Sequence, residues 1–248
     1  GGVLTLTLNR PEALNAITPT MLATLGDLLL EASEDDSVRV VVLTGSGRAF
    51  SAGVDLLALG GRELTNGIVG DILDVPARRV TGLLSTMPKP TVARVNGHCF
   101  TGALELVLSC DLAIVVAEAK LGDTHAKFGL RPTWGLSQRL PRLIGIAAAR
   151  ELSYTPLSAQ TGEPARVFSG AEAAEIGLVT RSVPATELDD AVDGLVRAIL
   201  ANSPGSLAAY KDLYREALEL SLSDGLAYEA GAVYQIADTA DRLSGFGS

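Results

Sequence analysis

The chain has 248 residues and a formal net charge of −9, with 47% hydrophobic and only 4% aromatic residues. An acidic chain with few aromatic residues lacks both the basic field and the stacking surface that nucleic-acid binding needs, so we exclude nucleic acid as a partner. No uninterrupted apolar run reaches the roughly 18 residues of a membrane span. Length and apolar content therefore suit a single α/β unit with a substantial core and no membrane partner.

The two cysteines, Cys99 and Cys110, do not match any zinc-binding spacing, and we predict that they are buried small hydrophobic residues. No motif calls for a metal, and no Gly-x-Gly-x-x-Gly fingerprint of a nicotinamide site follows a strand. The first residues resemble neither a signal peptide nor a transit peptide. We therefore expect a reduced, cytoplasmic protein without a metal.

Hydrophobic periodicity and turn residues predict the elements of the chain. In the first part we predict a strand over 3–8, a helix over 20–32 begun by Thr18-Pro19, a strand over 38–43, a loop of small residues over 45–53, a mobile loop over 60–70, a helix over 75–86 and a strand over 91–95. Then follow a turn at 96–97, a helix over 104–110, a strand over 112–116, two short helices between 135 and 152, an extended loop over 151–170, a helix over 171–175, a strand over 178–183, and three helical pieces over 187–241 broken near Pro204 and Asp224. Alternating strands and helices followed by helices alone predict a βαβ-built core with a helical C-terminal region.

Two stretches, 47–56 and 96–111, each place a glycine just after a predicted strand and before a helix. Backbone N–H groups at such a junction have no helical partner, and two of them aimed at one point would form an oxyanion hole. Gly53 and Gly102 could equally serve only to permit tight turns.

Glu105 lies three residues beyond Gly102 in an otherwise apolar helical stretch. A buried carboxylate costs several kcal/mol unless it is paired or hydrogen-bonded. A functional role for Glu105 is therefore plausible, and a structural salt bridge is the alternative.

Four stretches, 10–16, 47–56, 96–111 and 121–141, resemble in order and spacing the crotonase (enoyl-CoA hydratase/isomerase) superfamily, and Gly177-Leu178-Val179 resembles a late strand of the same family. The resemblance covers nearly the whole chain. It implies an α/β fold built as a spiral of ββα turns with a helical C-terminal trimerisation region. Residues 1–185 would form the core with the acyl-CoA site, and residues 186–248 the helical region of the same unit.

The same resemblance implies an acyl-CoA thioester as substrate, with coenzyme A carried by the substrate and no other cofactor. The backbone N–H groups of Val54 and Gly102 would hold the thioester carbonyl and stabilise an enolate. The positions matching the family's substrate-binding stretches are Ala13, Leu14, Ala52 and Asp55. A homotrimer, or a hexamer made of two trimers, is the assembly that the family implies.

The sequence departs from the family at the second catalytic glutamate. Glu105 matches the first glutamate, but the second position holds His125, within Asp123-Thr124-His125. A histidine can accept or donate a proton near neutral pH, so Glu105 and His125 could still form an acid/base pair. Alternatively, His125 fills the pocket and bonds a neighbour, or Asp123 supplies the missing carboxylate.

Trp134 replaces a residue that is often small in the family, and its indole could reshape the acyl pocket or pack between helices. His98 is interpreted as a packing residue. The stretch 155–169 is longer than the family's usual loop and has no assigned role. The chain ends at Ser248 without the basic tail that helps many relatives hold the coenzyme A phosphate, so other residues would have to do so.

The sequence favours a hydratase that adds water to a trans-2-enoyl-CoA in fatty-acid metabolism, because Glu105 is retained. Another enzyme of the same fold, such as an isomerase, a decarboxylase or a thioester hydrolase, is the first alternative, since the fold does not fix the reaction. A non-catalytic acyl-CoA-binding protein is the second.

Overall fold

The computed structural model describes residues 1–59, 64–155 and 166–244. Within these residues the strands form two sheets. The first sheet is entirely parallel and has the order β1 (Val3–Leu8), β2 (Val40–Gly45), β4 (Thr91–Val95), β6 (Leu112–Val116) and β9 (Arg181–Val183). The second has the order β3 (Ala49–Ser51), β5 (His98–Phe100), β7 (Lys120–Gly122) and β8 (Phe168–Ser169), with β8 antiparallel to β7.

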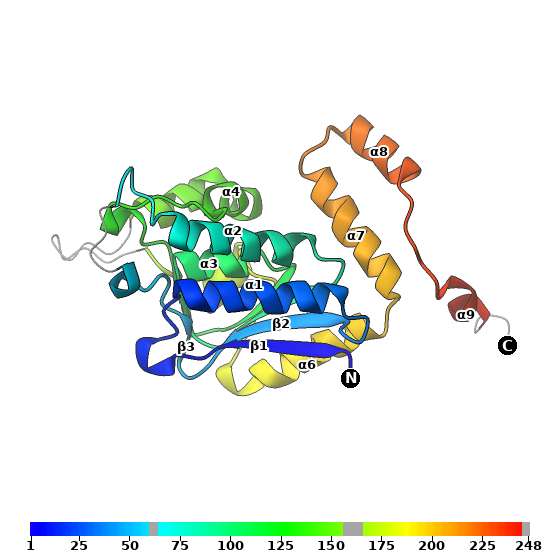
Figure 1. The fold of residues 1–248 in the computed structure, drawn as a ribbon, viewed down its shortest axis with the longest axis horizontal. Helices are drawn as coiled ribbons and strands as arrows, with labels where there is room; N and C mark the ends of the chain where they lie inside the picture. The colour runs from blue at the N-terminus through cyan, green and yellow to red at the C-terminus, as the bar shows by residue number, and fades with distance from the viewer. Residues whose placement is uncertain (60–63, 156–165, 245–248) are drawn as a thin grey trace.

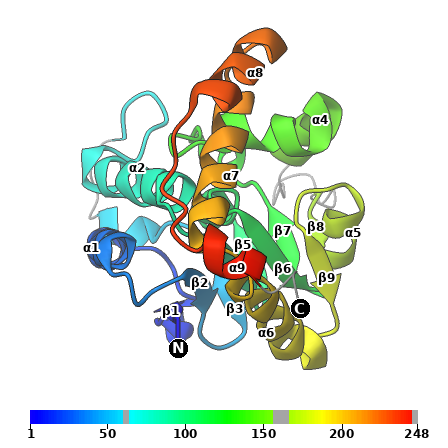
Figure 2. The same ribbon diagram turned by 90° about the vertical axis from the view of Figure 1, so that its right-hand side faces the viewer.

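Helices follow the strand pairs and then make up the C-terminal part of the chain (Figures 1 and 2). Their bounds are α1 Pro19–Glu34, α2 Asp71–Thr86, α3 Gly102–Val107, α4 Leu136–Tyr154, α5 Gly170–Glu175, α6 Leu188–Leu200, α7 Pro204–Ala217, α8 Leu222–Gly231 and α9 Thr239–Ser244. Short 3₁₀ turns lie at Pro11–Ala13, Leu56–Leu59, Ala126–Phe128 and Ala185–Glu187. The α/β class and the succession of ββα turns are therefore confirmed.

The central strands are buried on both faces. Every residue of β2 is buried, which fits the run of β-branched residues that begins at Val40. Helix α1 begins where the sequence predicts, with the Thr18 side chain accepting a hydrogen bond from the Met21 N–H and Pro19 at the first helical position. Helices α1 and α2 pack side by side on one side of β1 and β2, and α6 lies on the other (Figure 1).

The second sheet is the main feature that the sequence did not predict. The stretch 45–53 was expected to be a loop, but it contains β3, and β5 follows the predicted turn at 96–97. Strands of two or three residues are too short for a hydrophobic period to be read. The predicted strand over 178–183 is likewise shorter, because only Arg181–Val183 pair with β6.

The C-terminal helices also differ from the prediction. The break expected near Asp224 lies at residues 218–221, and a non-helical stretch over 232–238 separates a further helix, α9. The two short helices predicted between 135 and 152 are the two halves of α4, which meet at a non-helical Gly145. Most of the stretch 155–169, and residues 60–63 of the loop expected to be mobile, lie outside the described residues. No described helix is long and apolar enough to cross a membrane.

A buried side chain, Asn15, joins the turn after β1 to the second sheet. Its amide nitrogen donates to the carbonyl oxygens of Ser46, Ala49 and Phe50, and its Oδ1 accepts from the Arg10 N–H. Asn15 has a positive φ of 54°, which asparagine tolerates better than most residues. This network fixes the turn beside the end of β3, where the site begins.

We expect Asn15→Leu to lower the free energy of unfolding by about 3 kcal/mol, because it removes the amide that donates to the carbonyl oxygens of Ser46, Ala49 and Phe50. Asn9→Ala, at an exposed position of the same turn, should change it by less than about 0.5 kcal/mol. Urea denaturation at one fixed protein concentration measures both. Equal effects of the two substitutions would contradict the role of Asn15.

Candidate active site

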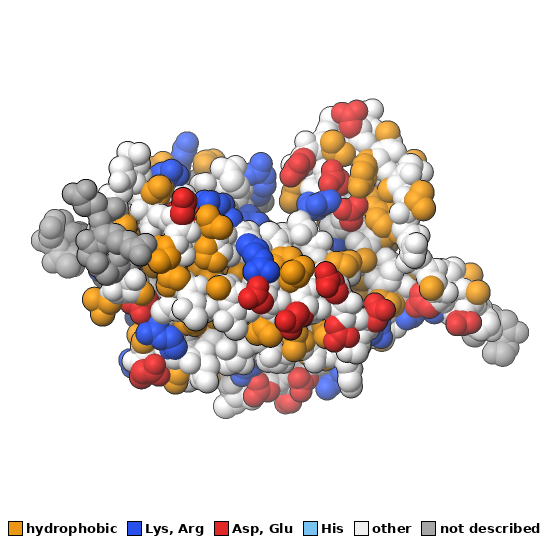
Figure 3. Space-filling model, in the orientation of Figure 1, with side chains coloured by type: hydrophobic (Ala, Val, Ile, Leu, Met, Phe, Trp, Pro, Cys, Tyr) orange, Lys and Arg blue, Asp and Glu red, His pale blue; other side chains and the backbone are white. Residues whose placement is uncertain are grey.

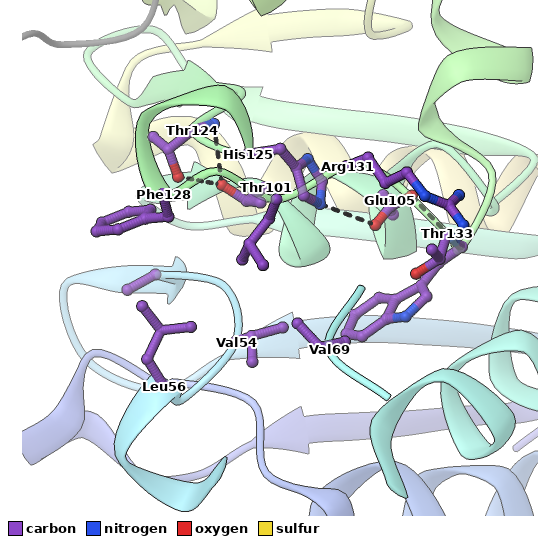
Figure 4. Close-up of a pocket in the computed structure, with 13 residues that line it drawn as sticks. Val54, Leu56, Val69, Thr101, Glu105, Thr124, His125, Phe128, Arg131 and Thr133 are labelled. Atoms are coloured by element: carbon purple, nitrogen blue, oxygen red, sulfur yellow. Dashed lines mark hydrogen bonds and ion pairs between the residues drawn. The ribbon is translucent and has the colours of Figure 1, made fainter. Parts of the chain in front are cut away.

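A pocket lies where the ends of the short strands meet the start of α4 (Figure 4). Its cavity volume is about 50 Å³. The lining residues come from four separate segments and include Ala52, Val54, Leu56, Val69, Thr101, Glu105, Thr124, His125, Phe128, Leu130, Arg131, Thr133 and Trp134. In Figure 4, Val54, Leu56 and Val69 lie across the pocket from His125 and Glu105, so an apolar wall faces a polar one.

Gly102 begins α3, and its N–H therefore has no partner within the helix. The preceding residue, Thr101, caps the helix without a side-chain hydrogen bond to it and has an unusual backbone conformation with φ 54° and ψ −114°. Its hydroxyl is instead paired with that of Thr124. Strained backbone of this kind is concentrated at functional sites, where it holds a group in a required direction.

Gly53 brings the second candidate N–H close to the first. Its φ is +94°, and a Cβ placed on it would lie only 2.9 Å from the carbonyl oxygen of Phe100. Glycine is needed here for both reasons. The segment carrying Val54 therefore runs directly against the segment that leads into α3, and no hydrogen bond from the Val54 or Gly102 N–H is found among the described residues.

Glu105 is 1% exposed and lies in the first turn of α3. Its Oε1 accepts hydrogen bonds from the backbone N–H groups of Trp134 and Leu136, both at 3.0 Å. Burial raises the pKa of the Glu105 carboxyl above its ordinary value, and these hydrogen bonds oppose the rise only in part. With Oε1 occupied, Oε2 is the oxygen available to a proton or a ligand.

His125 lies between Glu105 and a second carboxylate. Its Nδ1 is 2.7 Å from Asp123 Oδ1, and its Nε2 is 3.8 Å from Glu105 Oε2. Burial would raise the pKa of Asp123, but the hydrogen bonds and charge of His125 outweigh it, so this pKa lies below its ordinary value. An ionised carboxylate only accepts hydrogen bonds, so His125 donates its Nδ1–H and turns Nε2 toward Glu105.

The gap between His125 Nε2 and Glu105 Oε2 is too long for a direct hydrogen bond. Both atoms can nevertheless lie about 2.8 Å from one water molecule placed beside the line that joins them. Figure 4 shows the two side chains directed at each other at the edge of the pocket. The arrangement can therefore hold one water molecule between two groups able to exchange protons with it.

The structure brings five of the predicted site residues to this pocket: Glu105, His125, Val54, Ala52 and Trp134. Gly102 lies against it, because a Cβ on this glycine would meet the Trp134 ring at 2.6 Å. Ala13, Leu14 and Asp55 do not line it. Asp55 instead binds Arg10 at 2.9 Å, and the Leu14 carbonyl accepts from the Ala52 N–H.

Two polar residues of this region were missed by sequence reasoning. Asp74 of α2 is 2% exposed and accepts hydrogen bonds from the Thr133 hydroxyl and the Trp134 indole. Thr101 pairs with Thr124 beside the pocket. Asp74 is an acidic residue in the first turn of a helix, which in sequence is typical of a solvated position, so only the tertiary contacts reveal it.

Comparison with known proteins gives matches along nearly the whole chain. The family model described as "Enoyl-CoA hydratase/isomerase" matches residues 1–248. "Probable enoyl-CoA hydratase 1, peroxisomal" from Arabidopsis thaliana is 36% identical over 231 residues, covering 92% of this chain and 81% of the relative. A solved enoyl-CoA hydratase from Bacillus anthracis has a TM-score of 0.86 at 33% identity, covering 99% of this chain and 91% of that chain. A solved monofunctional enoyl-CoA isomerase from M. smegmatis has a TM-score of 0.74 at 31% identity, covering 94% and 95%.

The raised pKa of Glu105 has a consequence for stability. A carboxyl whose pKa is higher in the folded than in the unfolded state contributes fully below the unfolded pKa of about 4.5, and this contribution is lost as pH rises through the folded pKa. We therefore expect Glu105→Gln to gain stability relative to the parent protein as pH rises from about 4.5 through the folded pKa, by about 1.4 kcal/mol for each unit of pKa shift.

Urea unfolding across this pH range provides the measurement, and Asp55→Asn provides a control of opposite sign. The Asp55 pKa is lowered, chiefly by its hydrogen bond from Arg10, so the stability that this variant loses relative to the parent should develop as pH rises toward about 4 and stay constant above it. A stability difference between Glu105→Gln and the parent that is constant with pH would mean that the Glu105 pKa is not raised.

Proposed function

This chain belongs to the enoyl-CoA hydratase/isomerase family, and we propose that it adds water across the double bond of a trans-2-enoyl-CoA thioester. The observation that carries the proposal is the 3.8 Å gap between His125 Nε2 and Glu105 Oε2 in one pocket. Hydration needs one group to take a proton from water and one to deliver a proton to the α-carbon. The two side chains supply these two groups.

In the proposed reaction, His125 Nε2 takes a proton from the bridging water as the water oxygen bonds to the β-carbon. The π electrons of the double bond move to the thioester oxygen, where the N–H groups of Val54 and Gly102 would stabilise the enolate. The carboxylic acid of Glu105 then donates its Oε2 proton to the α-carbon, and the carbonyl re-forms. Return of the proton from His125 to Glu105 restores the starting state.

The environments of the two groups support this division of roles. Burial favours the protonated form of Glu105, which suits a proton donor. Asp123 holds the Nδ1–H of His125, which leaves Nε2 unprotonated in the neutral ring and stabilises the cation that forms when Nε2 accepts a proton. Asp123 would thus act through His125 and not in place of the second glutamate.

The remaining site residues are assigned by the same proposal. Ala52 and Asp55, with Ala13 and Leu14 on the adjoining turn, would border the path of the coenzyme A moiety. Hydrogen bonds between this turn and the 51–53 segment support the assignment, because they make the two segments one surface. The coenzyme arrives with the substrate, and no step requires a further cofactor.

We also propose that the protein is a homotrimer or a pair of trimers. Helices α7 and α8 project from one end of the molecule in Figure 1, and apolar side chains are visible along them in Figure 3. Large exposed apolar residues on α7–α9 and the intervening stretches are Tyr210, Tyr214, Leu218, Leu220, Leu222, Leu226, Tyr228, Val233, Ile236 and Leu243. Apolar surface of this extent is typical of a protein–protein interface.

Two further expectations stay predictions. The division into a core over 1–185 and a helical region over 186–248 of one unit is supported by the packing of α6 against β2 and β6. A cytoplasmic location is supported by two free cysteines, Cys99 and Cys110, although the relative from Arabidopsis is named as peroxisomal.

We expect purified protein to abolish the absorbance of the conjugated enoyl thioester in crotonyl-CoA. Glu105→Gln should lower kcat by about 100-fold or more, because the proton donor is lost, while butyryl-CoA binding changes little. His125→Ala should lower kcat by roughly 10- to 100-fold, since Glu105 can still order the water.

His98→Ala is the matched control, because His98 does not line the pocket, and it should keep the parent kcat. If the protein binds acyl-CoA but leaves the absorbance unchanged, hydration is not its reaction. If Glu105→Gln retains full kcat, the assignment of Glu105 as proton donor is wrong.

The tautomers of the two histidines provide an independent test. The chain contains only His98 and His125. His98 Nδ1 accepts a hydrogen bond from the Lys120 N–H, so a neutral His98 carries its proton on Nε2, whereas His125 carries its proton on Nδ1. We expect ¹⁵N NMR of the imidazoles, recorded at a pH where both rings are neutral, to show two opposite tautomers.

Asp123→Asn should disturb the His125 signals alone and lower kcat by about tenfold or more with little change in KM. Asp123→Glu, which keeps the carboxylate, should recover part of the loss. An unchanged His125 tautomer together with a parent kcat in Asp123→Asn would remove Asp123 from the mechanism.

A further inference from the structure

Three hydrogen bonds hold Trp134 in place, two through its backbone and one through its indole ring. Its backbone N–H donates to Glu105 Oε1 at 3.0 Å, and its carbonyl accepts from Arg139 Nη1 at 3.1 Å. Its indole Nε1–H donates to Asp74 Oδ1 at 2.8 Å. The ring and the backbone of this residue are therefore fixed by separate partners.

The Asp74 carboxylate, which accepts the hydrogen bond from the indole, is itself stabilised by its surroundings. Asp74 is buried in the first turn of α2, where the helix dipole favours a negative charge, and it also accepts from the Thr133 hydroxyl at 2.6 Å. Swinging the indole away would leave its N–H without a partner and the buried carboxylate with one hydrogen-bond donor fewer. The indole is thus a fixed wall, unlike a flexible aliphatic side chain.

This wall stands beside the reacting atoms of the proposed substrate. The edge of the ring lies so close to Gly102 that a Cβ on this glycine would be 2.6 Å from ring atom Cζ3. Trp134 is 3% exposed and lines the pocket together with Glu105 and His125. It therefore occupies space next to the expected oxyanion hole that a small residue would leave open.

The remaining room is small. The cavity volume is about 50 Å³, whereas an apolar protein cavity of roughly 150 Å³ can hold a benzene molecule. The space beside the Trp134 ring is therefore small for a long acyl chain.

We propose that Trp134, anchored by Asp74, is the specificity-determining wall of the acyl pocket and restricts the protein to short-chain enoyl-CoA thioesters. The inference rests on the proposed function in taking acyl-CoA as the ligand. It assigns a role to Asp74, whose carboxylate takes no part in the proposed reaction: Asp74 is a positioning residue that acts through the Trp134 ring.

The test compares a four-carbon with a ten-carbon substrate, crotonyl-CoA and trans-2-decenoyl-CoA, by kcat/KM, and the saturated thioesters butyryl-CoA and decanoyl-CoA by calorimetric Kd. The parent protein should prefer the four-carbon ligand in both measurements. Trp134→Ala keeps the backbone N–H that holds Glu105 and should shift the preference toward the ten-carbon ligand by about tenfold or more.

Asp74→Ala, which releases the ring, should shift the preference in the same direction by a smaller factor. Asp74→Asn can still accept both hydrogen bonds and should keep the parent's preference for the four-carbon ligand. In a Trp134→Ala background, Asp74→Ala should have no further effect on the preference, because the ring through which it acts is gone. A merely structural Asp74 would instead lower all rates equally in both backgrounds.

Phe128→Ala is the matched control, since Phe128 is an aromatic residue of the same pocket that is half exposed and has no hydrogen-bond anchor. It should alter the preference by less than about twofold. Equal binding of both chain lengths by the parent protein, or an equal shift in Phe128→Ala and Trp134→Ala, would overturn the proposal. Selective binding of butyryl-CoA without hydration of crotonyl-CoA would instead overturn the proposed function and leave the wall in place.

Discussion

The structure of the site depends on the hydrogen bonds that the Glu105 carboxylate accepts from the backbone of residues 134 and 136. They join the first turn of α3 to the start of α4 across the pocket. Because one oxygen satisfies both N–H groups, the other is left free to face His125. The same contact also fixes the backbone from which the Trp134 ring projects. The proposed catalytic geometry and the shape of the pocket therefore both depend on these hydrogen bonds.

Three buried carboxylates lie within this small region, and each is stabilised differently. Glu105 is held mainly by backbone N–H groups, Asp123 by His125, and Asp74 by the hydroxyl and indole donors of residues 133 and 134. An unpaired buried carboxylate would cost several kcal/mol, so each needs its donors. For Glu105 the effect of burial exceeds that of the hydrogen bonds, so its pKa is raised. For Asp123 the effect of His125 exceeds that of burial, so its pKa is lowered. Two acids with opposite pKa shifts beside one histidine suit the acid/base roles that we propose.

Under the proposed function, the residue at position 125 bears on the choice among the reactions open to this fold. An isomerase moves a proton between carbons and needs no water site, whereas His125 and Glu105 leave a gap suited to one water molecule. A buried Asp–His pair costs desolvation and returns little stability. This cost supports the proton transfer that we propose for the pair.

The local sequence was enough to predict the longer strands and helices and most of the polar residues of the site. The strand at 3–8 follows from the alternation of apolar residues with threonine, and the strands at 91–95 and 112–116 follow from largely buried apolar runs. The start of α1 at Pro19 follows from the Thr18 cap. The motifs also located Glu105, His125 and Val54, although their grouping was implied by family resemblance and not by spacing.

Only the tertiary structure decided what depends on contacts between distant segments. The short strands of the second sheet form because β3, β5 and β7 pair with one another, and no single one carries a readable period. The role of Asp123 behind His125, and the anchoring of Trp134 by Asp74 sixty residues away, depend on the side-chain directions that packing imposes. Sequence thus determined which chemical groups are present and roughly where the chain folds, and tertiary packing decided which of them face one another.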